Sequence, residues 1–303
     1  METLLTEHNL ILAEAAIVER LHRSGRIALH PTLVNAPLIY DEKGRDELIK
    51  IYQSYISIAE MAQVPILLTT PTWRANSERV KKAKANPNIN SDAVHFLKGL
   101  REAYGSEAST IKIGGFLGCK HDAYKPEEGL TVTESEAFHS WQIDQLAESG
   151  AEYLIAGTLP NVGEATGIAK AMDATGTPYI ISFVIDRSGF VLDGTRLWDA
   201  IVQIDSATNR KPLCYMVNCS YPTFLNADEQ PSILFTRFLG YQANSSSLSF
   251  CQLDGSEQLQ REDISEWTEE MLKLNREYGV KILGGCCGTD DTYLLSLVKE
   301  MAV

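Results

Sequence analysis

The sequence predicts an α/β fold, a closed (β/α)8 barrel of the TIM type that forms one domain over residues 1–303. Short apolar runs alternate with amphipathic stretches, a pattern typical of parallel strands joined by crossover helices. Eight such units fit into about 280 residues, a usual length for one barrel. An open doubly wound sheet is the alternative, but no glycine-rich dinucleotide fingerprint follows the first predicted strand.

The elements follow this alternation along the chain. A leading helix is predicted over 1–24, where apolar residues recur at helical spacing. Apolar runs predict eight strands, at 26–30, 64–70, 111–117, 153–158, 179–185, 213–218, 237–241 and 280–284. The clearest intervening helices are expected at 45–63, 134–149, 195–208 and 265–278. A capping box from Thr133 to Glu136 is expected at the start of the second of these helices.

Composition and charge exclude several classes of partner. Hydrophobic residues make up 44% of the chain, enough to fill a large core, and the net charge of −13 disfavours nucleic acid and anionic membranes. No apolar segment approaches the ~20 residues that span a bilayer, and the N-terminus lacks the basic start of a secretion signal. We therefore expect a cytoplasmic protein whose six cysteines stay reduced, with no nucleic-acid or membrane partner.

Three of the cysteines come at predicted strand ends. Cys286 and Cys287 lie side by side between Gly285 and Gly288, after the eighth strand, and Cys219 follows the sixth. The glycines let the backbone leave the strand there, so neighbouring thiols can face one ion. Strand ends meet at the carboxyl-terminal face of a barrel, where active sites lie. Three thiolates with one open position are typical of a catalytic zinc, because a structural zinc usually has four protein ligands.

The alternative for these cysteines is burial as small core hydrophobes. The flanking glycines argue against it, because glycine weakens a core strand. Two other cysteines serve as comparisons. Cys214 begins the sixth strand, at the wrong end of the barrel for a site, whereas Cys119 follows the third strand at the correct end. We expect Cys119 to line the pocket more than to bind metal.

The segment Gly284-Gly-Cys-Cys-Gly-Thr289, with Asn218-Cys219 upstream, resembles the homocysteine S-methyltransferase family. Similar segments at Thr69–Asn76 and Gly157–Ala165 follow in the family's order. The resemblance implies a (β/α)8 barrel in which three cysteines, here Cys219, Cys286 and Cys287, bind Zn²⁺ and act in catalysis through it. It implies methyl transfer to a zinc-bound thiolate, by default homocysteine to give methionine.

Other positions are implied to bind substrates. Trp73 follows the second strand, where it could contact a cationic methyl donor through its ring, and the alternative is packing at the barrel mouth. Asn218 could orient the zinc site, or simply end its strand. Thr70 and Thr158 are placed in the same substrate pocket, at the ends of the second and fourth strands.

Two positions depart from the family. Relatives that use homocysteine bind its amino group with an acid after strand one and a glutamate before the threonine after strand four. We place His30 and Gly157 at these positions. An ammonium without charge partners is costly to bury. We therefore expect an altered acceptor, either a thiol without an amino group there or homocysteine held by other acids, such as Glu164 or Asp186.

Three functions remain open from the sequence. The first is zinc-dependent S-methyl transfer between a small thiol and a small methyl donor. The second is a methyltransferase or demethylase of the same family that uses a non-homocysteine thiol or an unusual donor. The third is a catalytically silent zinc-binding subunit of a larger methyltransferase system. No cobalamin- or folate-binding extension is recognisable, so we expect any corrinoid partner to be a separate protein. The sequence leaves open whether the chain forms a homo-oligomer.

Overall fold

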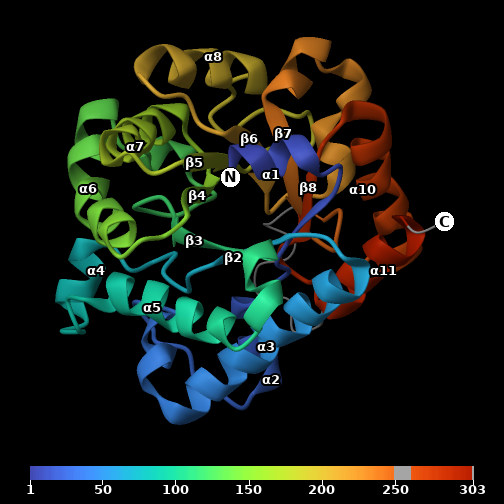
Figure 1. Ribbon diagram of the computed structural model, residues 1–303. Helices are drawn as coiled ribbons and strands as arrows, with labels where there is room; N and C mark the ends of the chain where they lie inside the picture. Colours follow the sequence, from blue (N-terminus) through green and yellow to red (C-terminus); the bar gives the residue numbers. More distant parts are fainter. Residues whose placement is uncertain (249–260, 302–303) are drawn as a thin grey trace.

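The computed structural model of the protein describes residues 1–248 and 261–301 and confirms the predicted fold class. Within these residues, eight parallel strands close into a barrel in chain order, and β8 pairs with β1. Figure 1 shows the helices as a ring around the strands. The strands are Ile11–Ala13 (β1), Ile66–Thr69 (β2), Ile111–Leu117 (β3), Tyr153–Leu159 (β4), Tyr179–Phe183 (β5), Cys214–Asn218 (β6), Phe238–Ala243 (β7) and Ile282–Gly285 (β8).

Most helices connect one strand to the next on the outside of the barrel. The α-helices of the described residues are Glu2–Glu7 (α1), Val18–Ser24 (α2), Glu42–Ala62 (α3), Ser77–Lys82 (α4), Ile89–Glu102 (α5), Val132–Glu148 (α6), Val162–Thr175 (α7), Leu197–Ala207 (α8), Ile264–Tyr278 (α10) and Asp291–Met301 (α11). The four predicted helices are confirmed. The capping box of α6 is formed by Thr131 and Glu134, two residues earlier than predicted, because the helix begins before Thr133.

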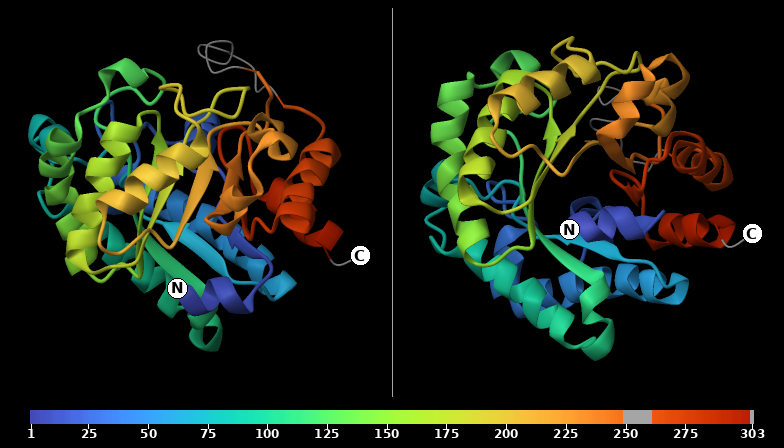
Figure 2. Two further views of the ribbon diagram at one scale, coloured as in Figure 1. Left: turned by 90° about the horizontal axis from the view of Figure 1, so that it is seen from above. Right: turned by 45° about the horizontal axis from the view of Figure 1, so that its top comes forward.

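Apolar side chains form two layers. The larger layer fills the space between the strands and the surrounding helices. The smaller layer fills the barrel interior, where Ile11, Ile155, Cys214 and Ile282 meet. Leu5 of α1 joins this interior layer, so α1 covers the amino-terminal end of the barrel (Figure 1). Both views of Figure 2 show the N-terminus at this end and α11, the last helix, on the outside of the barrel.

The prediction for the first strand is wrong. The stretch predicted as a leading helix over 1–24 forms α1, β1 and α2 instead, and the strand predicted at 26–30 is a loop. A three-residue strand is too short to show strand periodicity, so its apolar residues were counted toward a helix. The apolar run at 26–30 has another cause, because Ile27 and Leu29 pack against the outer core. The other seven predicted strands are confirmed to within two residues at each end.

None of the helices in the described ranges combines the length and the apolar character that crossing a bilayer requires.

Candidate metal centre

Three thiols meet at the carboxyl-terminal end of the barrel. β6 ends at Asn218 and β8 at Gly285, so Cys219, Cys286 and Cys287 directly follow strands that end at the same face. Their sulfur atoms all lie within 4.8 Å of one another, and the Sγ atoms of Cys219 and Cys287 are 3.9 Å apart. Cys219 and Cys286 are half-buried and Cys287 is exposed, so the cluster is open to an incoming molecule.

The spacing and the donor atoms fit zinc. A tetrahedral zinc with Zn–S bonds of about 2.3 Å places its sulfur ligands about 3.8 Å apart. The distance between the Sγ atoms of Cys219 and Cys287 is close to this value. Soft thiolate ligands favour zinc over magnesium or calcium. Three protein sulfurs would leave one tetrahedral position for an external ligand.

The three thiols titrate as one unit. Hydrogen bonds from the thiols of Cys286 and Cys287 lower the pKa of Cys219 well below its usual range. The hydrogen bond to Cys219 in turn raises the pKa of Cys286 and of Cys287, because each gives up its proton less readily beside a thiolate. The cluster alone therefore favours one negative charge. A divalent cation is needed to hold all three as thiolates at neutral pH.

Glycines let the double-cysteine turn form. A Cβ atom on Gly284 would lie 2.7 Å from the carbonyl oxygen of Ala13, and one on Gly285 would lie 2.1 Å from Oγ1 of Thr289. Gly288 has a φ of 81°, which favours glycine. Any larger residue at these positions would displace β1 or Thr289. The local sequence therefore directs both thiols toward Cys219.

Asn218 links two strained residues beside the cluster. Its Oδ1 accepts hydrogen bonds of 2.7 Å from the Thr158 N–H and the Ser182 hydroxyl, and its Nδ2 donates to Thr158 Oγ1 at 2.6 Å. Thr158 Oγ1 lies 3.8 Å from Cys219 Sγ, to which it donates. Thr158 and Cys219 have φ values of 57° and 55°, unusual for residues other than glycine. The network holds both in conformations that they would otherwise avoid.

Asn244 holds the other side of the cluster. Its side-chain oxygen accepts from the backbone N–H of Cys287 at 3.1 Å, and the Cys287 carbonyl accepts from Ser245 N at 2.9 Å. The carbonyl of Asn244 accepts from the indole of Trp267, which is buried. The loop after β7 is therefore fixed against the loop after β8. The sequence analysis assigned Asn244 no role.

The loop after β3 contributes a side chain that the sequence did not indicate. The Tyr124 hydroxyl donates a hydrogen bond to Cys219, and the charge on Cys219 raises the pKa of Tyr124 well above its usual range. Glu164 fixes this loop, because its carboxylate accepts from Lys120 N at 2.7 Å and contacts His139 Nε2 at 2.9 Å. Cys119 belongs to the same loop and is buried, and burial raises its pKa to about 11.

Trp73 lies near this loop with one face already covered. The guanidinium of Arg74 lies 4.0 Å from the centre of its ring, so a cation of the protein occupies that face. A Cβ atom on Gly118 would lie 2.1 Å from Trp73 Nε1, which has no hydrogen-bond partner in the described part of the chain. Thr70 is buried and bonds to the Phe116 N–H at 2.9 Å. Thr70 therefore connects β2 to β3.

The acid after strand one is Glu14, not His30. Since β1 ends at Ala13, the argument that placed His30 at this position is wrong. The His30 ring caps a turn and accepts from the N–H groups of Thr32 and Leu33 at 3.1 Å. Glu14 is buried at the barrel mouth, where burial raises its pKa to about 8. The sequence could not reveal Glu14 as long as β1 was read as helix.

Gly157 is where the sequence placed it, in β4 directly before Thr158. A Cβ atom there would point at the Phe116 ring and at Asn218. The position therefore faces the barrel mouth, and the Phe116 ring covers it.

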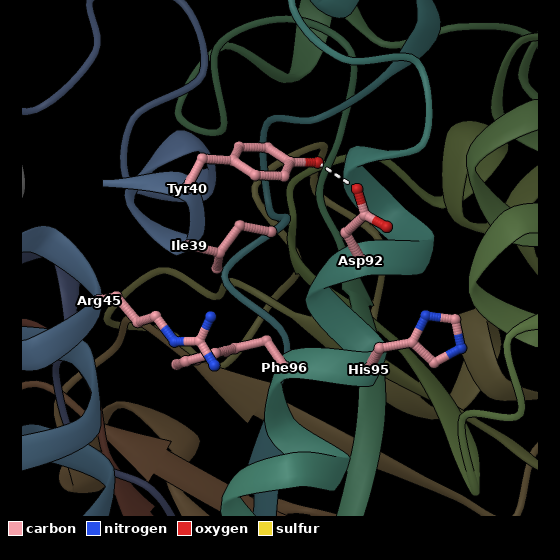
Figure 3. A pocket seen from close by; sticks show the side chains of 6 residues that line it. All are labelled: Ile39, Tyr40, Arg45, Asp92, His95 and Phe96. Carbon is pink, nitrogen blue, oxygen red and sulfur yellow. Dashed lines mark hydrogen bonds between the residues drawn. The ribbon is translucent and has the colours of Figure 1, made fainter. Parts of the chain in front are cut away.

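A separate hollow lies outside the barrel (Figure 3). It measures about 280 Å³ between α3 and α5, and its lining includes Tyr40, Arg45, Asp92 and Phe96. The Tyr40 hydroxyl donates to Asp92 Oδ2, and the Arg45 guanidinium lies 5.5 Å from the centre of the Phe96 ring. These polar groups already have partners, and no thiol lines the hollow. Chemistry is therefore expected at the mouth and not here.

Several known proteins are similar to this chain. The family described as Homocysteine S-methyltransferase matches residues 1–301. Selenocysteine Se-methyltransferase of Brassica oleracea var. italica is 24% identical over 57% of this chain and 50% of its own length. Homocysteine S-methyltransferase of Escherichia coli is 25% identical over 66% of this chain and 67% of its own. This chain thus aligns with only about half of the Brassica relative.

A solved structure shares the fold. The metallated form of the homocysteine methyltransferase MmuM from Escherichia coli superposes with a TM-score of 0.77, at 18% identity, over 98% of each chain. The match of the family over nearly the whole length shows that the chain belongs to the homocysteine S-methyltransferase family.

Proposed function

We propose that the protein is a zinc-dependent S-methyltransferase that moves a methyl group from a small cationic donor to a thiol. The convergence of three cysteine sulfurs at the open end of the barrel carries this proposal. Membership of the family supports it, and relatives named for homocysteine and selenocysteine support a thiol or selenol acceptor. Homocysteine, which would give methionine, is the reference acceptor.

Zinc bound by Cys219, Cys286 and Cys287 would keep the acceptor's sulfur deprotonated at neutral pH. Three thiolates around a divalent ion carry a net charge of −1, which attracts a sulfonium or quaternary ammonium donor. The acceptor's sulfur lone pair forms the new S–C bond. The donor's bond to the methyl carbon breaks, its electron pair stays on the donor, and the donor leaves neutral. No covalent enzyme intermediate is needed.

The chain's own residues would hold this arrangement rigid. Thr158, oriented by Asn218, donates to Cys219, and Tyr124 donates to the same sulfur. Asn244 fixes the backbone of Cys287. These bonds set the directions of the thiolates before the substrates arrive, so little reorganisation is required during transfer.

The test is methyl transfer by the isolated, zinc-loaded protein. S-methylmethionine and glycine betaine serve as donors, and homocysteine heads a panel of small thiols as acceptors. We expect a methylated thiol to form. Methyl transfer should stop when zinc is removed with a chelator and resume when zinc is added back. The contrary result is no transfer with any donor and thiol from a protein shown to hold one zinc per chain. Such a protein would fit a non-catalytic zinc-binding subunit.

A further inference from the structure

The wall next to the cysteine cluster is apolar on the side of β3 and β4. Phe116, near the end of β3, is half-buried and packs against the interior layer of the barrel. Its ring covers Gly157, because a Cβ atom there would lie 2.7 Å from Phe116 Cε2 and 3.2 Å from Cζ. Gly157 is followed by Thr158, which donates to Cys219. The Phe116 ring therefore covers the residue directly before Thr158, whose hydroxyl contacts a sulfur of the metal site.

A side chain at position 157 would require the Phe116 ring to move. The same Cβ atom would lie 3.5 Å from Asn218 Oδ1, so a side chain at 157 would point into the mouth between the ring and the asparagine. Phe116 occupies the space that such a side chain would need. The two residues thus form one apolar surface in place of a polar group.

Glu14 and Glu164, two acidic side chains near the mouth, already have hydrogen-bond partners. Glu14 accepts from Thr69 N at 2.8 Å and bonds to Thr69 Oγ1 at 2.5 Å, so each of its oxygens has a partner. Its raised pKa of about 8 favours the neutral form at pH 7. Glu164 holds the loop after β3 through Lys120 N and His139.

Acids in the loop after β5 close turns of the backbone. Asp186 accepts from Ser188 N at 2.8 Å and from Phe190 N at 3.2 Å. Asp193 accepts from Val162 N at 2.7 Å and Thr195 N at 3.0 Å. Glu14 and Asp193 therefore each have a donor at both carboxylate oxygens, whereas both bonds to Asp186 use its Oδ1.

We infer that the acceptor is a thiol without an ammonium group beside the sulfur-binding site, and that Phe116 and Gly157 together select it. This inference rests on the proposed function. An ammonium group brought against Phe116 would lose water without a carboxylate at position 157 to pair with, which is costly. The attraction between a cation and a phenyl ring is too weak to offset this loss. An uncharged carbon chain instead gains contact with the ring.

Two thiols test the inference directly. Homocysteine and 4-sulfanylbutanoate have the same carbon chain, thiol and carboxylate, and differ only in the α-amino group. Their binding is followed by the absorption spectrum of the cobalt-substituted protein, which reports a new sulfur ligand without requiring methyl transfer. We expect the wild-type protein to bind 4-sulfanylbutanoate at least 10-fold more tightly than homocysteine.

Two variants test the role of the apolar surface. The double variant Phe116→Ala/Gly157→Glu opens the space and fills it with a carboxylate, so the preference should reverse in favour of homocysteine. The single variant Phe116→Ala serves if the double variant does not fold. It should weaken 4-sulfanylbutanoate binding several-fold and leave homocysteine binding unchanged, and Phe116→Leu should keep the wild-type preference.

The outcomes separate this inference from the proposed function. If both thiols bind and homocysteine binds more tightly to the wild-type protein, the inference is overturned while the proposed function stands. An unchanged preference in both Phe116→Ala and the double variant also overturns the assignment of Phe116 and Gly157. If neither thiol alters the cobalt spectrum, the thiol-binding role of the site fails, and the inference fails with it.

Discussion

The two ends of β6 carry the same residue in opposite chemical roles. Cys214, at the amino-terminal end, is fully buried in the barrel interior, and burial raises its pKa to about 12. Cys219, at the carboxyl-terminal end, meets two other thiols, whose hydrogen bonds lower its pKa. The amino-terminal end is covered by α1 and lined with apolar side chains. Because both residues are cysteines, the end of the barrel strand at which each one lies determines which of them is reactive.

The two ends also differ in backbone strain. Cys214 lies in the extended backbone of β6, whereas Cys219 has a φ of 55° and its neighbour Thr158 a φ of 57°. Thr158 is hydrogen-bonded to Asn218, and Cys219 directly follows Asn218 in the chain. Strain of this kind persists where surrounding bonds enforce it, and it is concentrated at functional sites. At the barrel mouth the chain thus adopts strained, less stable backbone conformations that position the side chains of the site.

Replacing the cysteine at each end of β6, one at a time, should give the largest difference in zinc content and activity. Cys219→Ser removes one of three sulfurs, so we expect loss of zinc and a fall of about 1000-fold or more in methyl transfer, because thiol activation is lost. Cys214→Ala removes only buried apolar volume. We expect it to keep one zinc per chain and full activity, and to lower the free energy of unfolding by about 1–2 kcal/mol.

Zinc content by elemental analysis and stability by denaturant titration distinguish the two variants. If Cys219→Ser kept its full zinc content, or if Cys214→Ala lost its zinc, the proposed difference between the two ends of β6 would be contradicted.

The sequence was sufficient to predict the barrel and the cysteine cluster, because seven strands show as apolar runs and the cysteines follow two of them. It was insufficient for β1, whose three residues have no visible period. Glu14 was missed for that reason. Tyr124 and Phe116 were missed because their roles depend on a loop and a neighbouring strand that only the folded chain brings to Cys219 and Gly157.

Replacing Asn218, which also lies at the carboxyl-terminal end of β6, should have a smaller effect. Asn218→Ala removes the bonds that hold Thr158, so zinc affinity should fall about 10- to 100-fold, as is typical when a partner of a metal ligand is lost. Ser182→Ala removes one bond to Asn218 and leaves the bonds to Thr158, so its effect should be weaker. Competition with a coloured zinc chelator measures both, and equal affinities in all three proteins would show that the network does not support the site.

The effect of Glu14 should appear in the stability of the folded chain. Its pKa is raised from 4.5 to about 8, so the folded chain keeps a proton that the unfolded chain releases. The stabilisation is complete below pH 4.5 and is lost as the pH rises through about 8. We expect the unfolding free energy of the wild type, relative to Glu14→Gln, to fall by up to about 1.4 kcal/mol per pH unit between pH 5 and 8. Denaturant titrations of both proteins across this range measure the difference, and a constant difference would contradict the raised pKa.

The central claim is that the sulfurs of Cys219, Cys286 and Cys287 share one zinc and leave one position for a thiol. X-ray absorption at the zinc edge tests it most directly, with and without an acceptor thiol. We predict three sulfur neighbours in the resting protein and four after a thiol that serves as acceptor is added. Four sulfurs before any thiol is added, or a sulfur count that no thiol changes, would contradict the claim.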